Sequence, residues 1–447
     1  MTSSPSVYKG DITMSLQLGI SRVDITPEIG GNLYGYNPDI YSDSVNDPLE
    51  ATAFFFTDGA KQFLLINATI CAIGKEIGDA TRKAIEEKTG IPFDNIIICA
   101  THTHSGPSTK YSPGWGEPDT AYCYDILLPQ LVKASQEATS DTKPVKMGFA
   151  SGESYAGINR LQWDGNNIIL GQNPWGVFNP KMVVISFKDE NDNNVATLVH
   201  YGAHCTAAGP NTEITRDWAG IMTDRLARET GCPVAFLQGP EGDTGPRLSN
   251  GATHGRGDIN YIYETGNVAA LDAVRIFKQI DTYLDVDMDF ITNGVKMPVD
   301  KRMSIEDAKK WLGYFERNEG NDYKSVQTRS IDYYNRIIAS YDTDFDEVEY
   351  ATIEQTVLRL GDIAIVSSPY ELFCEIGMRV NEMSPFAHTL MLVNTNDTYA
   401  YFPTTSAIPC GGYEIALFLT SRIQPYTAPA DWNYIKGTVE NVKRLKK

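Results

Sequence analysis

Two histidines separated by one residue, His102 and His104, are the residues whose type and spacing point most directly to chemistry. They follow residues 95–98, a short apolar run typical of a buried strand, and they precede a Ser-Gly-Pro turn signal at residues 105–107. In a strand-like geometry alternate side chains share a face, so both imidazoles are expected to point into one pocket. Neutral imidazole is the commonest metal ligand in proteins. The alternative is a pair of hydrogen-bonded loop histidines.

Further candidate groups occur where other predicted strands end. His204 follows a buried run that also contains His200, Asp243 lies in a Gly-rich loop after a short core strand, and Glu371 is expected at a helix start. The chain has only six histidines, and four of them lie in these loops or their feeding strand. Histidines combined with carboxylates suit a catalytic zinc ion with one position left open for water. The pKa of such a water falls to roughly 7.

Three of these residues, Asp243, His200 and Glu371, also have a structural interpretation. Asp243 is either a general base or a residue that holds a zinc ligand in place, but Asp in a Gly/Pro-rich loop is as often a turn residue. His200 is expected to be structural. For Glu371 the alternative is a carboxylate that interacts with the N-terminal dipole of a helix.

The elements that must position these groups alternate between strands and helices. Apolar runs at residues 51–56 and 62–69, joined by an Asp-Gly pair, predict a hairpin, and residues 74–88 have helical periodicity. The mixture of hairpins and alternating elements predicts an α/β fold with mixed β-sheets flanked by helices, and a metal site on loops at strand ends. A charged, Tyr-rich stretch at residues 297–347 is expected to be an inserted helical subdomain.

Composition restricts the partners. The chain has 447 residues and a formal charge of -19, which argues against nucleic acid and against stable membrane association. Seven scattered cysteines without a C-x-x-C pair predict reduced thiols and a cytoplasmic setting. No apolar run approaches the ~20 residues needed to span a bilayer. The expected partner is a small-molecule substrate, and the oligomeric state is open.

Several segments, in order along the chain, resemble the catalytic domain of the neutral (non-lysosomal) ceramidases, which are zinc-dependent amidases, and the wider set of bacterial ceramidase-like proteins. The most specific is the Thr-His-Thr-His-Ser-Gly-Pro string at residues 101–107. The others are residues 21–27, 158–160, the His204 segment, 242–243, 369–371 and 396–401. The resemblance implies one ceramidase-like catalytic domain at residues 16–447, after a disordered lead at 1–15 and without the family's immunoglobulin-like C-terminal domain.

The resemblance also implies a ligand set. It implies zinc held by His102, His204, Glu371 and Tyr401. His104 would support the zinc-bound water or the developing oxyanion. On the sequence alone, Tyr401 would be taken for a buried aromatic residue.

The remaining site residues concern substrate and proton transfer. Arg160 is implied to contact substrate or transition state, Asp243 is a candidate for moving protons, and Thr244 and Tyr399 are expected to contact substrate. One departure matters: the ceramidases carry a serine with an assigned catalytic role just before the loop proline, and here that position is Gly245. A zinc-water mechanism is unaffected because it needs no side-chain nucleophile.

The sequence therefore predicts a zinc-dependent hydrolase in which zinc-bound hydroxide attacks the carbonyl carbon of a polar small substrate, an amide, a lactone or a related ester. The first alternative is N-acylsphingosine amidohydrolase activity, that of a neutral ceramidase, without the serine. The second is a non-catalytic zinc-containing binding protein.

Overall fold

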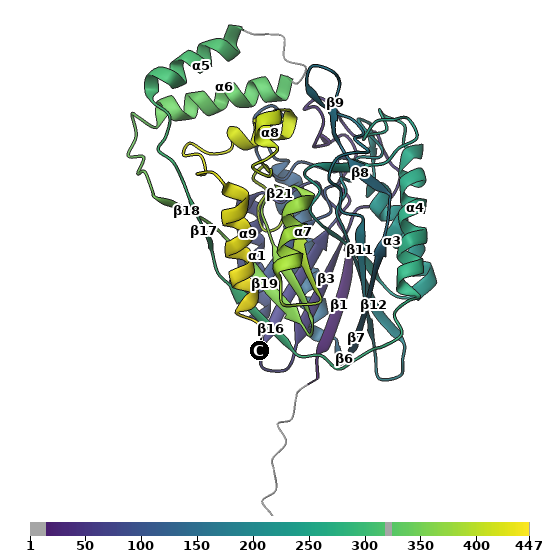
Figure 1. The fold of residues 1–447 in the computed structure, drawn as a ribbon. Helices are drawn as coiled ribbons and strands as arrows, with labels where there is room; N and C mark the ends of the chain where they lie inside the picture. The colour runs from purple at the N-terminus through teal and green to yellow at the C-terminus, as the bar shows by residue number, and fades with distance from the viewer. Residues whose placement is uncertain (1–14, 318–323, 447) are drawn as a thin grey trace, which may run out of the picture.

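Three β-sheets meet around one apolar core, and helices cover the outer face of each sheet (Figure 1). This arrangement is seen in a computed structural model that describes residues 15–317 and 324–446. Most of the expected disordered lead at residues 1–15 therefore lies outside the described residues. The mixed α/β architecture predicted from the sequence is confirmed.

The first sheet has strand order β5-β4-β3-β1-β6. Its strands are β1 (Gln17–Asp24), β3 (Glu50–Thr57), β4 (Gln62–Ala68), β5 (Ile96–Ala100) and β6 (Thr142–Pro144). The expected hairpin is β3 and β4, and β5 joins β4 in parallel. Helices α1 (Lys75–Thr89) and α2 (Leu128–Ser140) pack on the outer face.

The second and third sheets have four strands each. The second has the order β14-β12-β11-β7, and the third β16-β19-β20-β22. Their strands are β7 (Lys146–Glu153), β11 (Lys181–Lys188), β12 (Asn194–Tyr201), β14 (Val234–Gln238), β16 (Met288–Thr292), β19 (Thr356–Leu360), β20 (Ile363–Ser367) and β22 (His388–Leu392). Helices α3 (Asp217–Thr230) and α4 (Asn260–Phe277) cover the second sheet, and α7 (Cys374–Met383) and α9 (Ala430–Lys443) cover the third.

Side-chain alternation along the strands explains why the sheets are buried on both faces. On β3, Phe54 and Phe56 pack into the core shared by the three sheets, whereas Phe55 packs under the helices on the other side. On β4, Leu65 packs into the shared core and Leu64 packs under the helices. Successive side chains of a strand point to opposite faces, so a sheet covered on both sides needs an almost continuous apolar run, as these sequences have.

Short elements surround the ends of the main strands. They are β2 (Ser44–Val45), η1 (Phe93–Asn95), η2 (Tyr122–Leu127), β8 (Gly157–Asn159), β9 (Leu161–Trp163), β10 (Ile168–Leu170), β13 (Glu213–Ile214), β15 (Thr244–Pro246), β17 (Val295–Pro298), β18 (Tyr350–Ile353), β21 (Glu371–Leu372), β23 (Tyr401–Phe402), η3 (Ile408–Cys410) and α8 (Tyr413–Leu419). Helices α5 (Ile305–Arg317) and α6 (Lys324–Ala339) lie in the segment expected to hold an inserted subdomain, and they pack on each other at the upper end of the molecule (Figure 1). Within the described part of the chain, no helix combines the length and the apolarity that crossing a membrane requires.

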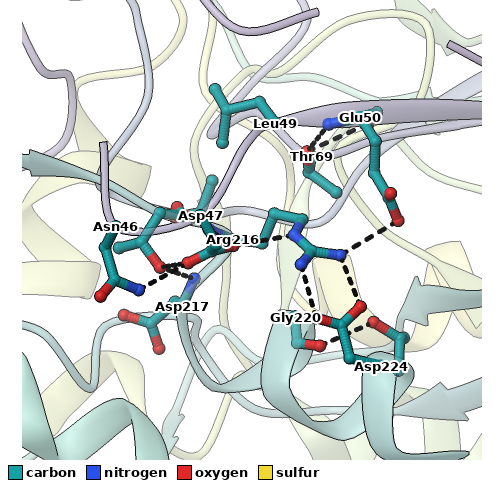
Figure 2. Close-up of polar contacts among 12 residues, drawn as sticks. Asn46, Asp47, Leu49, Glu50, Thr69, Arg216, Asp217, Gly220 and Asp224 are labelled. Carbon is teal, nitrogen blue, oxygen red and sulfur yellow. Dashed lines mark hydrogen bonds and ion pairs between the residues drawn. The ribbon is translucent and has the colours of Figure 1, made fainter. Parts of the chain in front are cut away.

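A buried arginine joins the first sheet to the helical layer of the second (Figure 2). The Arg216 side chain, 6% exposed, precedes α3 and donates to Asp47 Oδ1 at 2.8 Å and to Asp224 Oδ2 at 2.8 Å. It also lies 3.2 Å from Glu50 Oε1 on β3. Burial alone would lower the pKa of Arg216, but these carboxylates outweigh it and raise the pKa. One cation thus holds a loop, a strand and a helix together.

Replacing Arg216 by Met should lower the free energy of unfolding by about 3 kcal/mol. This is the low end of the cost of removing one partner from a buried ion pair, because Asp224 keeps 40% side-chain exposure. Urea unfolding followed by circular dichroism measures it. Arg225→Met, on α3 itself and with an exposed hydrogen bond to Asn267 as its one side-chain partner among the described residues, should change stability little. Equal effects of the two substitutions would contradict the anchoring role.

Candidate functional site

The two histidines of the first loop face one pocket, but the backbone that places them is bent and not strand-like. Strand β5 ends at Ala100, and His102 has φ +67°, in the left-handed region that non-glycine residues rarely adopt. Its amide donates to Ile70 O at 2.9 Å. The His102 Nδ1 atom lies 2.7 Å from Cys71 O. The expectation of a shared pocket is met, but the alternation argument behind it was wrong.

His204 follows β12 and is fixed in the same manner. Its Nδ1 lies 2.9 Å from Glu241 O and 3.0 Å from Thr244 O. A nitrogen that faces carbonyl oxygens carries the ring proton, so the lone pair stays on Nε2. His200, earlier on β12, is directed elsewhere, with Nε2 2.9 Å from Met391 O. Its expected structural role agrees with this contact.

Glu371 and Tyr401 are brought together by a short parallel strand pair. Glu371 on β21 is the register partner of Tyr401 on β23. The helix start predicted at Glu371 is wrong, because Glu371 lies on a strand and α7 begins only at Cys374. Glu371 Oε2 lies 3.4 Å from His102 Nε2 and 3.2 Å from His204 Nε2. Tyr401 Oη lies 3.5 Å from His204 Nε2.

The charges of this cluster favour an anionic carboxylate beside a protonated His102 and a neutral His204. Burial lowers the pKa of His102, but Cys71 and Glu371 outweigh it and raise that pKa well above its ordinary value. Burial raises the pKa of Glu371, but His102 and His204 outweigh it and hold the pKa well below its ordinary value. Burial and the Arg160 charge lower the pKa of His204 to about 3. Burial and then Glu371 raise the pKa of Tyr401 well above its ordinary value, so Tyr401 is a phenol in this environment.

These groups fit a metal ion. Ligand atoms of His102, His204 and Glu371 all lie within 4.8 Å of one another, and all three residues are buried. Cys71, His102 and His104 form a second such group. However, the Cys71 thiol lies 3.7 Å from His102 Nδ1, the nitrogen already engaged by a carbonyl. The first group, in which the Nε2 atoms of two histidines point at a buried carboxylate, is therefore the better candidate for zinc, with Tyr401 at its edge.

His104 lies next to this group. Its Nε2 is 3.2 Å from His102 Nε2, and its ring packs edge-on against Tyr36. A Cβ on Gly35, which has φ +125°, would meet the His104 ring at 2.4 Å, so only glycine allows this approach. Burial and the neighbouring histidines hold the pKa of His104 well below its ordinary value. Its buried Nδ1 has no hydrogen-bond partner among the described residues.

Arg160 lies behind Tyr401 and is not one of the pocket-lining residues. Its guanidinium carbon is 5.3 Å from the Tyr401 ring centroid, and its Nε donates to Glu414 Oε1 at 2.7 Å. Its Nη2 is buried without a hydrogen-bond partner among the described residues. The structure thus brings Arg160 near the cluster and leaves its Nη2 atom available for a further hydrogen bond.

The remaining predicted site residues are Asp243, Thr244 and Tyr399. Asp243 accepts from the Cys374 amide at 2.7 Å, at the start of α7, and burial raises its pKa to about 6. The Thr244 main-chain carbonyl holds His204, as described above. Tyr399 lies on the pocket wall, 37% exposed, edge-on to Tyr370.

Several groups at the site were missed in the sequence. Cys71 and Glu241 act through their carbonyls on the two histidines, and Glu414 pairs with Arg160. A main-chain contact leaves no side-chain signal. Glu241 was nevertheless within reach, because it lies two residues before Asp243 in the loop already singled out. The Glu241 carboxyl is fully buried, and burial raises its pKa well above its ordinary value.

A pocket opens onto the cluster. Its wall includes His102, His104, Glu371 and Tyr401. It adjoins an outer pocket, with which it shares Lys110, Ser112, Arg329, Thr398 and Tyr399. The cluster is therefore accessible from outside through a polar passage.

A family model described as neutral/alkaline non-lysosomal ceramidase, N-terminal, matches residues 16–257. The chain belongs to this family. The matched segment contains both histidine loops, whereas Glu371 and Tyr401 lie beyond it.

Individual relatives agree with this assignment. The chain is 25% identical over 257 residues to neutral ceramidase A of Dictyostelium discoideum, which covers 52% of this chain and 36% of that protein. It is 24% identical over 255 residues to the neutral ceramidase of Pseudomonas aeruginosa, covering 52% and 37%. The aligned part is thus little more than a third of either relative. The crystal structure of the P. aeruginosa neutral ceramidase has a similar fold, with TM-score 0.72 and 16% identity over 97% of this chain and 75% of that one.

At Gly245, the position at which the resemblance leads us to expect a serine, the neighbouring side chains leave no room for a Cβ. A Cβ there would lie 2.6 Å from the Thr253 Cβ. Both residues are buried, Thr253 at 5% exposure, and Gly245 is fixed in β15 opposite Ile158 of β8. A side chain at position 245 would therefore require Thr253 to move.

Gly245→Ala should lower the free energy of unfolding by about 1–3 kcal/mol, as overpacking does. Combining it with Thr253→Gly should cost less than the sum of the two single changes, because removing the Thr253 Cβ removes the clash. Thermal unfolding of the four variants of this cycle measures the coupling. Gly31→Ala, whose Cβ would meet nothing closer than 3.4 Å, is the control. Strict additivity would contradict the clash.

Proposed function

We propose that this chain is a zinc-dependent amidohydrolase of the neutral-ceramidase type. The observation that carries the proposal is the convergence of two Nε2 atoms on the buried Glu371 carboxylate, at 3.2 and 3.4 Å, at the bottom of an accessible pocket. Family membership favours an amide over the lactone and ester that the sequence left open. The proposed ligands are His102, His204, Glu371 and Tyr401. When bound, zinc would polarise a carbonyl and lower the pKa of a water.

The chain's own residues supply the proton transfers. In amide hydrolysis the water oxygen bonds to the carbonyl carbon, the C–N bond breaks and a proton reaches the leaving nitrogen. His104 is neutral, faces the pocket and lies beside His102, so it is suited to take the proton from water and to deliver it to nitrogen. Asp243, committed to the start of α7, is better explained as a positioning residue.

In this proposal Arg160 acts on the metal site through Tyr401. Its charge lies over the Tyr401 ring and opposes the rise in the Tyr401 pKa that burial causes. The Glu414 carboxylate holds the guanidinium in place. Arg160 therefore makes it easier for Tyr401 to bind a cation through its oxygen.

The sequence left two alternatives, ceramide as the substrate and a non-catalytic zinc-containing binding protein. Ceramide is the substrate suggested by the names of the relatives, and a polar small amide is favoured by Lys110 and Arg329 on the pocket wall. A non-catalytic zinc protein would have a closed site, whereas a pocket lined by His102, His104 and Glu371 reaches this cluster. We also propose a reducing, cytoplasmic setting, which the seven free cysteines support.

Purified wild-type protein should carry one zinc ion per chain, and Glu371→Gln and His204→Ala should carry little or none. Each substitution removes one of a small number of ligands from a buried site. Elemental analysis after dialysis against a weak chelator measures the metal, and turnover of a fluorescent ceramide and of a small aryl amide measures activity. His388→Asn, at a half-buried histidine outside the cluster, should keep both. Zinc-free, fully active wild-type protein would refute the proposal.

His104→Asn should keep the zinc and lower kcat by a factor of about 10² to 10⁴, the usual contribution of a general acid–base group. The reason is that His104 touches His102 but is not one of the proposed ligands. Single-turnover kinetics on zinc-loaded protein separate the chemical step from binding. A kcat within threefold of wild type would show that another group moves the proton.

A further inference from the structure

We propose, resting on the amidase function above, that the substrate is a small amide bearing a carboxylate, which Arg329 and Lys110 bind while the scissile carbonyl lies at the His102–His204–Glu371 cluster. Both cations belong to the wall shared by the inner and outer pockets. The cluster opens into the same inner pocket. One small molecule can therefore reach the cations and the cluster together.

Arg329 is the main observation. It projects from α6 and is 9% exposed. Its Nε atom is buried without a hydrogen-bond partner, and no carboxylate lies within ion-pair distance among the described residues. The acid one turn away, Asp332, is paired with Arg336 at 2.7 Å. A buried guanidinium without a counter-ion is costly to maintain, and an anionic ligand would remove that cost.

Lys110 is the second cation. Its Nζ donates to Thr398 O, and no carboxylate lies within 4 Å of it among the described residues. The nearest influence of opposite sign, Asp397, acts at longer range, and its Oδ1 accepts from the Thr398 amide. Burial lowers the pKa of Lys110 to about 8, with Arg329 contributing in the same direction. Two like charges thus share one passage.

The outer pocket has the same character. Its wall carries four cationic residues, Lys110, Arg329, Arg336 and Arg422, against two acidic ones, Asp332 and Asp397. The whole chain has a formal charge of -19. A cationic entrance on an acidic protein concentrates small anions at that entrance. The same wall offers poor contacts for a long alkyl chain, because charged groups must lose water to touch it.

The test uses two matched pairs of amides and the zinc-loaded full chain. One pair places a carboxylate on the acyl side: succinyl-4-nitroanilide against butyryl-4-nitroanilide. The other places it on the amine side: N-butyryl-β-alanine against N-butyrylpropylamine. In at least one pair the acidic member should have at least tenfold higher kcat/KM. Arg329→Gln should lower that value about 10- to 100-fold, mainly through KM, as loss of a charge-assisted hydrogen bond does, and leave the neutral member within twofold.

Arg317→Gln is the matched control. It removes the same charge from the same pair of helices at an exposed position outside both pockets, and it should leave all four substrates unchanged. Equal kcat/KM for both members of each pair, insensitive to Arg329→Gln, would overturn the inference and leave the amidase proposal standing.

A binding measurement reads the anion site without turnover. Glutarate should bind wild-type protein in titration calorimetry, and Arg329→Gln should weaken binding at least tenfold. Glutarate binding that depends on Arg329, with no hydrolysis of any amide, would support the anion site while refuting the amidase proposal. Absence of glutarate binding to wild-type protein would overturn the inference. Thermal unfolding of each variant checks that the fold is retained.

Discussion

The site depends on two imidazole rings whose Nδ1 atoms are held by main-chain carbonyls, so that both Nε2 atoms face the Glu371 carboxylate. Cys71 O fixes one ring at 2.7 Å, and Glu241 O fixes the other at 2.9 Å. Because a carbonyl accepts only from N–H, each contact determines the tautomer as well as the orientation of the ring. Without these contacts the rings would rotate, and the lone pairs would not share a target.

The three sheets explain how loops so distant in sequence arrive at one point. His102 follows β5 of the first sheet, His204 follows β12 of the second, and Glu371 follows β20 of the third. Main-chain contacts join the sheets at these ends: the Asn396 amide donates to Ile98 O at 2.9 Å, and the Val393 amide donates to Gln238 O at 3.2 Å. The shared apolar core below fixes the sheets against one another. Each sheet therefore delivers one ligand to the same end of the molecule.

Much of this could be predicted from the sequence, and the limits have physical reasons. Apolar periodicity identified most of the strands and helices, because burial on both faces leaves a continuous signal. It failed at residues 369–372, where Pro-Tyr-Glu suggested a helix, because a two-residue parallel pairing with residues 401–402 depends on a partner thirty residues away. The left-handed backbone at His102 could not be predicted from the sequence either. Local patterns predict local structure, whereas these features are imposed by tertiary contacts.

Two buried arginines, Arg216 and Arg329, differ in whether nearby carboxylates compensate their charge. Arg216 is surrounded by Asp47, Glu50 and Asp224, as a structural arginine must be when it is 6% exposed. Arg329 is almost as buried and has no such partner among the described residues. The fold pairs the Arg216 guanidinium with three carboxylates, whereas Arg329, at the wall of the pocket that reaches Glu371, has none within ion-pair distance in the described part of the chain. An unpaired charge in that place is explained by a ligand, because no carboxylate within the described part of the chain lies within ion-pair distance of Arg329 to offset its burial.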